Sequence, residues 1–171
     1  MSGDGTHRGA TAGQLRAAFD TAFARPLEAP ARDTVALLAL RAGGEPVAVR
    51  VLETAGLMAA RPVVPVPSPR PELLGVSGIR GAVVPIYSLA RLLGRADDGA
   101  PRWVVLAAAG ADRIGLAVAT FERHLAVPAA RIRPAAGAFG GTGHAPELLQ
   151  GEGAATPVLS VPSLVRAIMR R

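Results

Sequence analysis

The side chains that could carry acid–base, nucleophilic or metal chemistry are few in this sequence and far apart. Its three histidines, His7, His124 and His144, have no cysteine or paired carboxylate at the spacing of a metal site. A solvated histidine is the simplest interpretation of each, although His144, in a glycine-rich segment, could still act as a base. The sequence has no cysteine, which excludes disulfides, thiol catalysis and cysteine-based zinc sites.

The serines and glycines do not form a recognisable catalytic or nucleotide-binding motif. Ser68, Ser77, Ser88 and Ser163 lack the pattern of a nucleophile elbow. Residues 140–143 are rich in glycine but lack the lysine of a P-loop, so they favour a loop. We therefore expect a protein that is not an enzyme and that uses no cofactor and no metal. An enzyme with an unrecognised site is the weaker alternative.

Composition favours short strands packed around an aliphatic core. Of the 171 residues, 50% are hydrophobic but only 4% are aromatic, so the core must consist of Val, Leu, Ile and Ala. The length fits one domain, or two small ones that share a core. The 20 glycines and 15 prolines indicate many turns, which is typical of an all-β protein rather than a helical one.

The positive net charge could reflect a solvated surface, acidic protein partners or binding to nucleic acid. The net charge is +6, and every basic residue other than histidine is arginine. These arginines are scattered and do not alternate with aromatic residues, as stacking on nucleic-acid bases would require. We expect a solvated surface or acidic protein partners and no nucleic acid. A basic β-barrel that binds nucleic acid is the alternative.

The sequence contains no segment typical of secretion or membrane insertion. Residues 1–6 are polar and rich in glycine, unlike a secretory signal. No apolar run approaches the roughly 20 residues that span a bilayer. We expect a soluble, cytoplasmic protein with no direct membrane insertion.

An N-terminal extension of residues 1–32 precedes the main domain. Within it, residues 12–23 predict an amphipathic helix, because Leu15, Phe19 and Phe23 recur at helical spacing. Pro26 and Pro30 would end this helix. The helix could pack on its own domain or on a partner, so its role is open.

Two β-hairpins and several short elements follow. The first hairpin joins 34–41 to 46–52 through Gly43-Gly44, and the second joins 102–109 to 113–121 through 110–112. Prolines keep residues 61–71 extended on the surface, where valines can pair at an edge. The other expected elements are an extended segment 54–60, helical turns at 72–74 and 147–150, strands 123–127 and 157–161, a mobile loop 134–143, and a terminal helix 163–170.

The most informative stretch is 75–94. It predicts a strand, a tight turn at Arg80-Gly81, a second strand and a short helix that ends at Gly94. Pro85 indicates an edge strand or a bulge, because proline donates no backbone hydrogen bond. Arg80 at the turn should project away from the core.

These residues resemble the CheW-like domain. In that family a proline-containing segment leads to a G-x-x-N-L-R-G-x-x-x-P-x-x-D-L pattern, and here the similar segments are 65–67, 72–75, 79–86 and 89–94. The resemblance covers residues 33–168. It implies two intertwined five-stranded SH3-like β-barrels around a shared core. It also implies a scaffold, recruited to membrane receptor arrays, that binds the regulatory domain of a CheA-type histidine kinase and the cytoplasmic tip of a methyl-accepting chemoreceptor.

The resemblance also implies where partners bind. Arg80 matches the family's arginine at the turn, a position associated with coupling of receptor and kinase. The groove beside it would be lined by Val76, Ile79, Val83 and Thr54. This chain departs from the family at four positions: Gly78 replaces an asparagine, Ser88 an aspartate, Gly56 a common glutamate and Ala119 a common aspartate. Either other contacts replace these groups, or the partners differ.

Overall fold

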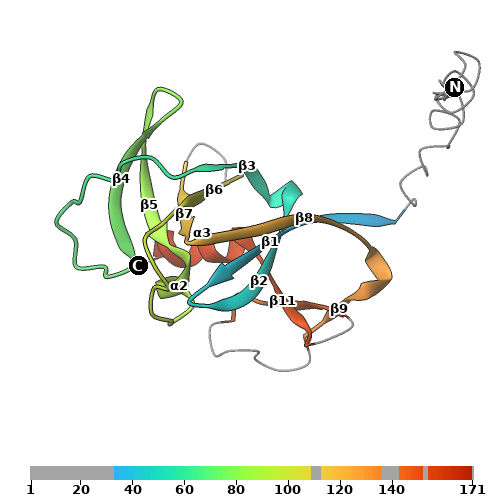
Figure 1. Ribbon diagram of the computed structural model, residues 1–171. Coiled ribbons are helices and arrows are strands. Elements are labelled where there is room, and N and C mark those ends of the chain that lie inside the picture. The colour runs from blue at the N-terminus through green and yellow to red at the C-terminus, as the bar shows by residue number, and fades with distance from the viewer. Residues whose placement is uncertain (1–32, 109–112, 136–142, 152–153, 171) are drawn as a thin grey trace, which may run out of the picture. The chain divides into compact units, whose positions relative to one another are not determined.

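The computed structural model describes residues 33–108, 113–135, 143–151 and 154–170. These residues belong to the second of two compact units, residues 33–171, into which the chain divides. The predicted helix 12–23, the turn 110–112 and most of the loop 134–143 lie outside the described residues. The described part is mostly β, with two sheets and two α-helices (Figure 1).

One sheet has six strands in the order β8-β1-β2-β11-β10-β9. All its neighbours are antiparallel except β11 and β2, which run parallel. Its strands are β1 (Thr34–Ala42), β2 (Glu45–Arg50), β8 (Thr120–Pro128), β9 (Ile132–Pro134), β10 (Glu147–Leu149) and β11 (Thr156–Leu159).

The other sheet has five strands in the order β3-β6-β7-β5-β4, with β5 and β7 parallel. Its strands are β3 (Thr54–Ala59), β4 (Leu73–Ile79), β5 (Ala82–Ser88), β6 (Trp103–Ala107) and β7 (Gly115–Val118). The chain therefore starts in the six-stranded sheet, builds the whole five-stranded sheet, and returns to complete the first. This interleaving confirms the predicted all-β, two-part fold.

The six-stranded sheet has one strand more than the five expected, and a misread tripeptide explains part of this difference. The sequence Glu-Leu-Leu occurs at 72–74 and 147–149, and we predicted a helical turn at each. Both predictions are wrong. Leu73 starts β4 and pairs with Tyr87, whereas 147–149 forms β10 between β9 and β11. Pairing with neighbouring strands outweighs the modest helix preference of Glu and Leu.

The predicted hairpin turn at Gly43-Gly44 has the expected chemistry. Ala42 pairs with Glu45 across Gly43-Gly44, whose φ values are +61° and +76°. Two positive φ values suit a two-residue hairpin loop, whose twist matches that of the strands. The second hairpin is also present, although residues 120–121 belong to β8 in the other sheet rather than to its returning strand.

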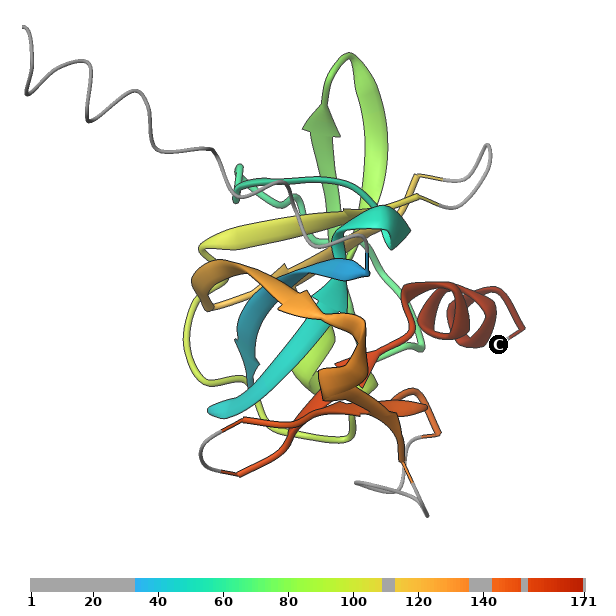
Figure 2. The same cartoon turned by 90° about the vertical axis from the view of Figure 1, so that its right-hand side faces the viewer.

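A shared core joins the sheets. Buried leucines and valines of β1 and β2 pack with those of β6 and β7, in one cluster with both α-helices. Trp103 and Phe121 add an edge-to-face contact between the sheets, with ring centroids 5.6 Å apart. Helix α3 (Val161–Arg170) buries Val161, Leu164, Val165 and Ile168 against this cluster and confirms the predicted terminal helix (Figure 2).

Helix α2 (Leu89–Leu92) shows how the chain compensates for the family's missing aspartate. Ser88 accepts a hydrogen bond from the Arg91 backbone amide at 3.2 Å and so caps the helix. The Ser88 hydroxyl donates to Asp97 at 2.5 Å, and Asp97 also accepts from the Arg91 guanidinium at 2.8 Å. A carboxylate from the following loop therefore supplies the negative charge that residue 88 lacks.

Candidate functional site

The hairpin of β4 and β5 carries the residues that the sequence singles out. In both ribbon views the tip of this hairpin projects beyond the neighbouring strands (Figures 1 and 2). Ile79 pairs with Ala82, so Arg80 and Gly81 alone form the loop, with φ values of +50° and +75°. Arg80 is the one non-glycine residue with positive φ among the described residues. Such a conformation is unfavourable for an L-residue by about 1 kcal/mol.

Alternation along the strands decides which predicted residues face outward. Ile79 is only 2% exposed and packs inside the five-stranded sheet with Val84 and Ile86. It cannot line an open groove, because its register places it on the inner face with Ser77. Val83, by contrast, is 75% exposed.

The remaining predicted residues lie on two elements. Val76 is half-buried and pairs with Pro85 on the outward face of the hairpin. Thr54 starts β3, and its hydroxyl donates to the Val51 carbonyl at 2.8 Å, which closes a short 3-10 turn. Arg80 approaches β3 at a different residue, Gly56, rather than at Thr54.

Pro85 sits inside the sheet, not on an edge strand, because β5 lies between β4 and β7. Both backbone hydrogen bonds of Val76 go to Val64, at 2.8 and 2.9 Å. Val76 and Pro85 are therefore a pair without mutual hydrogen bonds, and the proline nitrogen faces the β7 side. Pairing between β5 and β7 starts only at Ile86, so the missing donor breaks no ladder bond there. The bridge between Val64 and Val76 also confirms that the proline-rich segment 61–71, called the crossing below, pairs with the edge strand β4.

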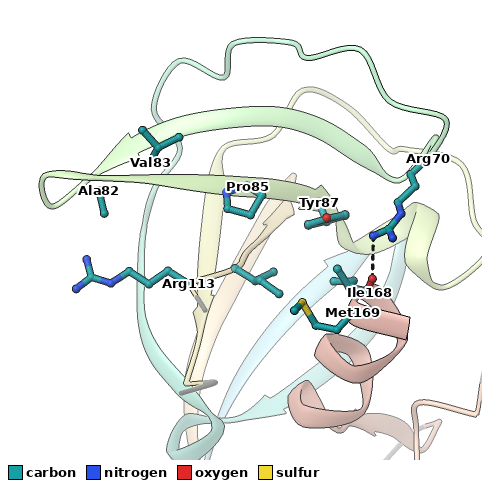
Figure 3. Close-up of a pocket in the computed structure, with 9 residues that line it drawn as sticks. Arg70, Ala82, Val83, Pro85, Tyr87, Arg113, Ile168 and Met169 are labelled. Carbon is teal, nitrogen blue, oxygen red and sulfur yellow. Dashed lines mark hydrogen bonds between the residues drawn. The ribbon is translucent and has the colours of Figure 1, made fainter. Parts of the chain in front are cut away.

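A groove of about 540 Å³ opens beside this hairpin, and we call it the β5–α3 groove (Figure 3). Residues of β5 line one side, and the last turn of α3 lines the other. Its lining residues are Arg70, Ala82, Val83, Pro85, Tyr87, Arg113, Ile114, Ile168 and Met169. The exposed apolar contribution comes mainly from Val83 and from Met169, which is 58% exposed.

Arg70 holds one end of the groove in place. Its guanidinium donates to the Ile168 carbonyl at 2.8 Å, as Figure 3 shows. The last carbonyls of a helix have no partner within the helix, and a basic side chain there also complements the helix dipole. Arg70 thus joins the proline-rich crossing to α3 across 98 positions of sequence.

Sequence reasoning did not find this groove. It selected Val83 from the hairpin but missed Arg70, Arg113 and Met169, which reach the groove from three other segments. One signal in the sequence was Met169, an apolar residue that lies beside the buried stripe of α3 rather than within it. It could have suggested that the end of α3 contributes to a binding surface.

The two histidines within the described part of the chain lie on different segments. His144 Nδ1 lies 3.0 Å from the Ser163 hydroxyl, which links the segment before β10 to the first turn of α3. His124 is exposed on β8. Among the described residues no group of three or more histidine, aspartate or glutamate side chains could hold a metal ion. The same residues include no helix that is long and apolar enough to cross a bilayer.

Comparison with known proteins places the fold. The model of the CheW-like domain matches residues 36–169. A solved structure, the scaffolding protein TtCheW from Thermoanaerobacter tengcongensis, superposes with a TM-score of 0.66 at 12% identity, over 74% of this chain and 88% of that one. At this identity the superposition supports the fold alone. No curated protein matches the sequence.

Proposed function

Because the chain belongs to the family of CheW-like domains, we propose that it is a non-enzymatic adaptor of chemotaxis-like signalling. It would bind the regulatory domain of a CheA-type histidine kinase and the cytoplasmic tip of a methyl-accepting chemoreceptor. It would act in the cytoplasm, at receptor arrays. The family match supports the adaptor class, and the geometry of the hairpin supports the binding role.

One observation carries the binding role: Arg80 is held at the projecting tip in a conformation that arginine disfavours. A glycine or asparagine would fit this turn position with less strain. Strained residues persist where the surrounding structure imposes them, and they cluster at sites of function. The Arg80 side chain is exposed and makes no hydrogen bond or ion pair with the described residues, so its guanidinium is available to a partner.

The residues around the tip fit a protein partner. Val83 gives an exposed apolar contact on the strand that follows Arg80. Val76 and Thr54 are half-buried on the two edge strands of the same sheet, β4 and β3. An arginine beside apolar side chains is typical of the centre of a protein interface. Ile79 would contribute indirectly, because its burial anchors the turn.

Titration tests the proposal directly. The full-length chain is titrated by calorimetry with the isolated kinase regulatory domain and, separately, with a soluble receptor fragment that contains the cytoplasmic tip. We expect saturable binding to each, and binding of the second partner to the complex with the first. Binding to neither partner would refute the proposal.

A further inference from the structure

The β5–α3 groove has an unbalanced charge. Arg70 and Arg113 line it, and no carboxylate is among the lining residues that the structure describes. Three arginines elsewhere in the described chain have carboxylate partners: Arg41 pairs with Glu122, Arg50 with Glu147 and Arg91 with Asp97, each at 2.7 Å. Neither Arg70 nor Arg113 forms an ion pair of this kind with a described residue, so the groove lining carries two positive charges.

The two arginines differ in how free they are. Arg70 uses one guanidinium nitrogen on the Ile168 carbonyl, which fixes the side chain and leaves its other N–H donors available. Arg113 is exposed and has no hydrogen bond or ion pair with the part of the chain that the structure describes. A preorganised guanidinium loses less side-chain entropy on binding, so Arg70 suits a fixed contact and Arg113 an adaptable one.

Figure 3 shows the two guanidinium groups toward opposite ends of the groove, with apolar side chains between them. Pro85 and Tyr87 lie on the β5 side, and Ile168 and Met169 lie on the α3 side. An occupant that fits this order has an apolar centre and negative charge at both ends.

We propose that the β5–α3 groove binds a short segment of a partner protein, with an apolar centre flanked by acidic residues. This inference rests on the proposed function in taking the occupant to be a protein, and it adds the chemistry of the docking segment. Carboxylates at the ends form charge-assisted hydrogen bonds with the guanidinium groups. The apolar centre covers Met169 and Val83, which are otherwise in water.

Single-stranded nucleic acid fits the groove less well, although it is also anionic. Base stacking needs an accessible aromatic face, and Tyr87, the one aromatic residue among the described residues that line the groove, is 8% exposed. A nucleic-acid occupant is therefore an outcome of the test rather than a second proposal.

The test uses a fluorescent peptide with blocked ends, Asp-Glu-Leu-Ala-Ala-Leu-Val-Glu-Asp, and the full-length chain. Fluorescence anisotropy measures its Kd, with a peptide in which lysine replaces every acid as the matched control. We expect the acidic peptide to bind at least about tenfold more tightly than the lysine peptide, with Kd rising as salt screens the charges. A thymidine oligonucleotide should not displace it.

Variants locate the binding site. Arg113→Glu should raise the Kd for the acidic peptide about tenfold or more, and Met169→Gln should raise it several-fold. Arg133→Glu is the control, because it makes the same change in net charge at a distant position. Arg133 is exposed on β9 in the other sheet. Circular dichroism confirms that each variant is folded.

Three results would overturn the inference: no binding of the acidic peptide, equal loss in Arg113→Glu and Arg133→Glu, or displacement by the oligonucleotide. Different results would refute the proposed function and the docking site. A chain that binds kinase and receptor but not the peptide remains an adaptor without this docking site. A chain that binds the peptide at the groove but neither signalling protein retains the docking site and loses the adaptor role.

Discussion

The guanidinium of Arg80 lies over the backbone of Gly56, with its Nη2 atom 3.7 Å from the point where a Cβ atom on Gly56 would lie. This contact connects the tip of the β4–β5 hairpin with β3, although β3 and β4 form opposite edges of the five-stranded sheet. Glutamate is common in the family at the position we matched to Gly56. Here no side chain at 56 can neutralise the guanidinium, so Arg80 keeps its charge available for a partner.

Reversing the charge of Arg80 should weaken partner binding and leave the fold intact. We expect Arg80→Glu to raise the Kd for kinase or receptor at least about tenfold, because a central interface arginine commonly contributes more than 1 kcal/mol. Calorimetry measures binding and circular dichroism measures folding. Arg133→Glu makes the same charge change on the other sheet and should bind normally. Loss of folding in Arg80→Glu would show that the side chain is structural.

Replacing Arg80 by asparagine should separate stability from function. Arg80→Asn creates an Asn-Gly loop, which suits two positive φ values better than Arg-Gly does. We expect the free energy of unfolding to rise by about 0.5–1 kcal/mol while partner binding falls. Urea denaturation and calorimetry on the same preparation measure the two quantities. A variant that is less stable than the parent would contradict the strained-turn account.

Two glycines of β4 should differ in how strongly alanine destabilises the protein. Gly75 has a φ of +143°, and a Cβ atom there would overlap the Val64 carbonyl group. Gly78 has open space around its Cβ position. We expect Gly75→Ala to lower the free energy of unfolding by about 3 kcal/mol or more, and Gly78→Ala to change it by less than about 0.5 kcal/mol. Similar urea midpoints for the two variants would refute the close contact between the crossing and β4.

The Ser88–Asp97 pair should behave as a substitute for the family's aspartate. Ser88→Ala removes both the helix cap and the bond to Asp97, so we expect a loss of about 1–2 kcal/mol. Ser88→Asp places two carboxylates together and should also destabilise the protein. Adding Asp97→Asn to Ser88→Asp should recover part of that loss. Unfolding free energies of the single and double variants measure the coupling, and additive effects would show that the two residues act independently.

Arg70 should hold the last turn of α3. Arg70→Gln removes the bond to the Ile168 carbonyl, and we expect a loss of about 1 kcal/mol. Amide hydrogen exchange should accelerate in the last turn of α3 but not in β1. Unchanged exchange near Ile168 would mean that packing alone fixes this end of the helix.

Local turn chemistry made much of the fold predictable. Gly43-Gly44 and Gly81 mark turns by residue type, because glycine tolerates positive φ, and apolar spacing identifies α3. The two Glu-Leu-Leu tripeptides were misread because their local preference is helical, whereas strands distant in sequence supply the hydrogen bonds that decide their structure. A single sequence does not show which distant strand will pair with a segment.

The candidate site was predictable only along the hairpin. Arg80 was predicted to project from the turn, and it is exposed. Val83 and Ile79 were both predicted to line a groove beside it; Val83 is exposed, but Ile79 is buried, because the register of β4 was not known. The groove depends on contacts such as Arg70 to Ile168, which join segments that the sequence separates widely. Their meeting follows from the interleaved order of the two sheets, and no local pattern encodes it.

The most direct test of the adaptor role is whether the chain bridges kinase and receptor. Kinase is sedimented with receptor-containing vesicles while the concentration of the chain is raised. We predict that sedimented kinase first rises and then falls, because excess adaptor occupies each partner separately, and that Arg80→Glu shifts the rise to higher concentration. Kinase sedimentation that is independent of the chain would contradict the account.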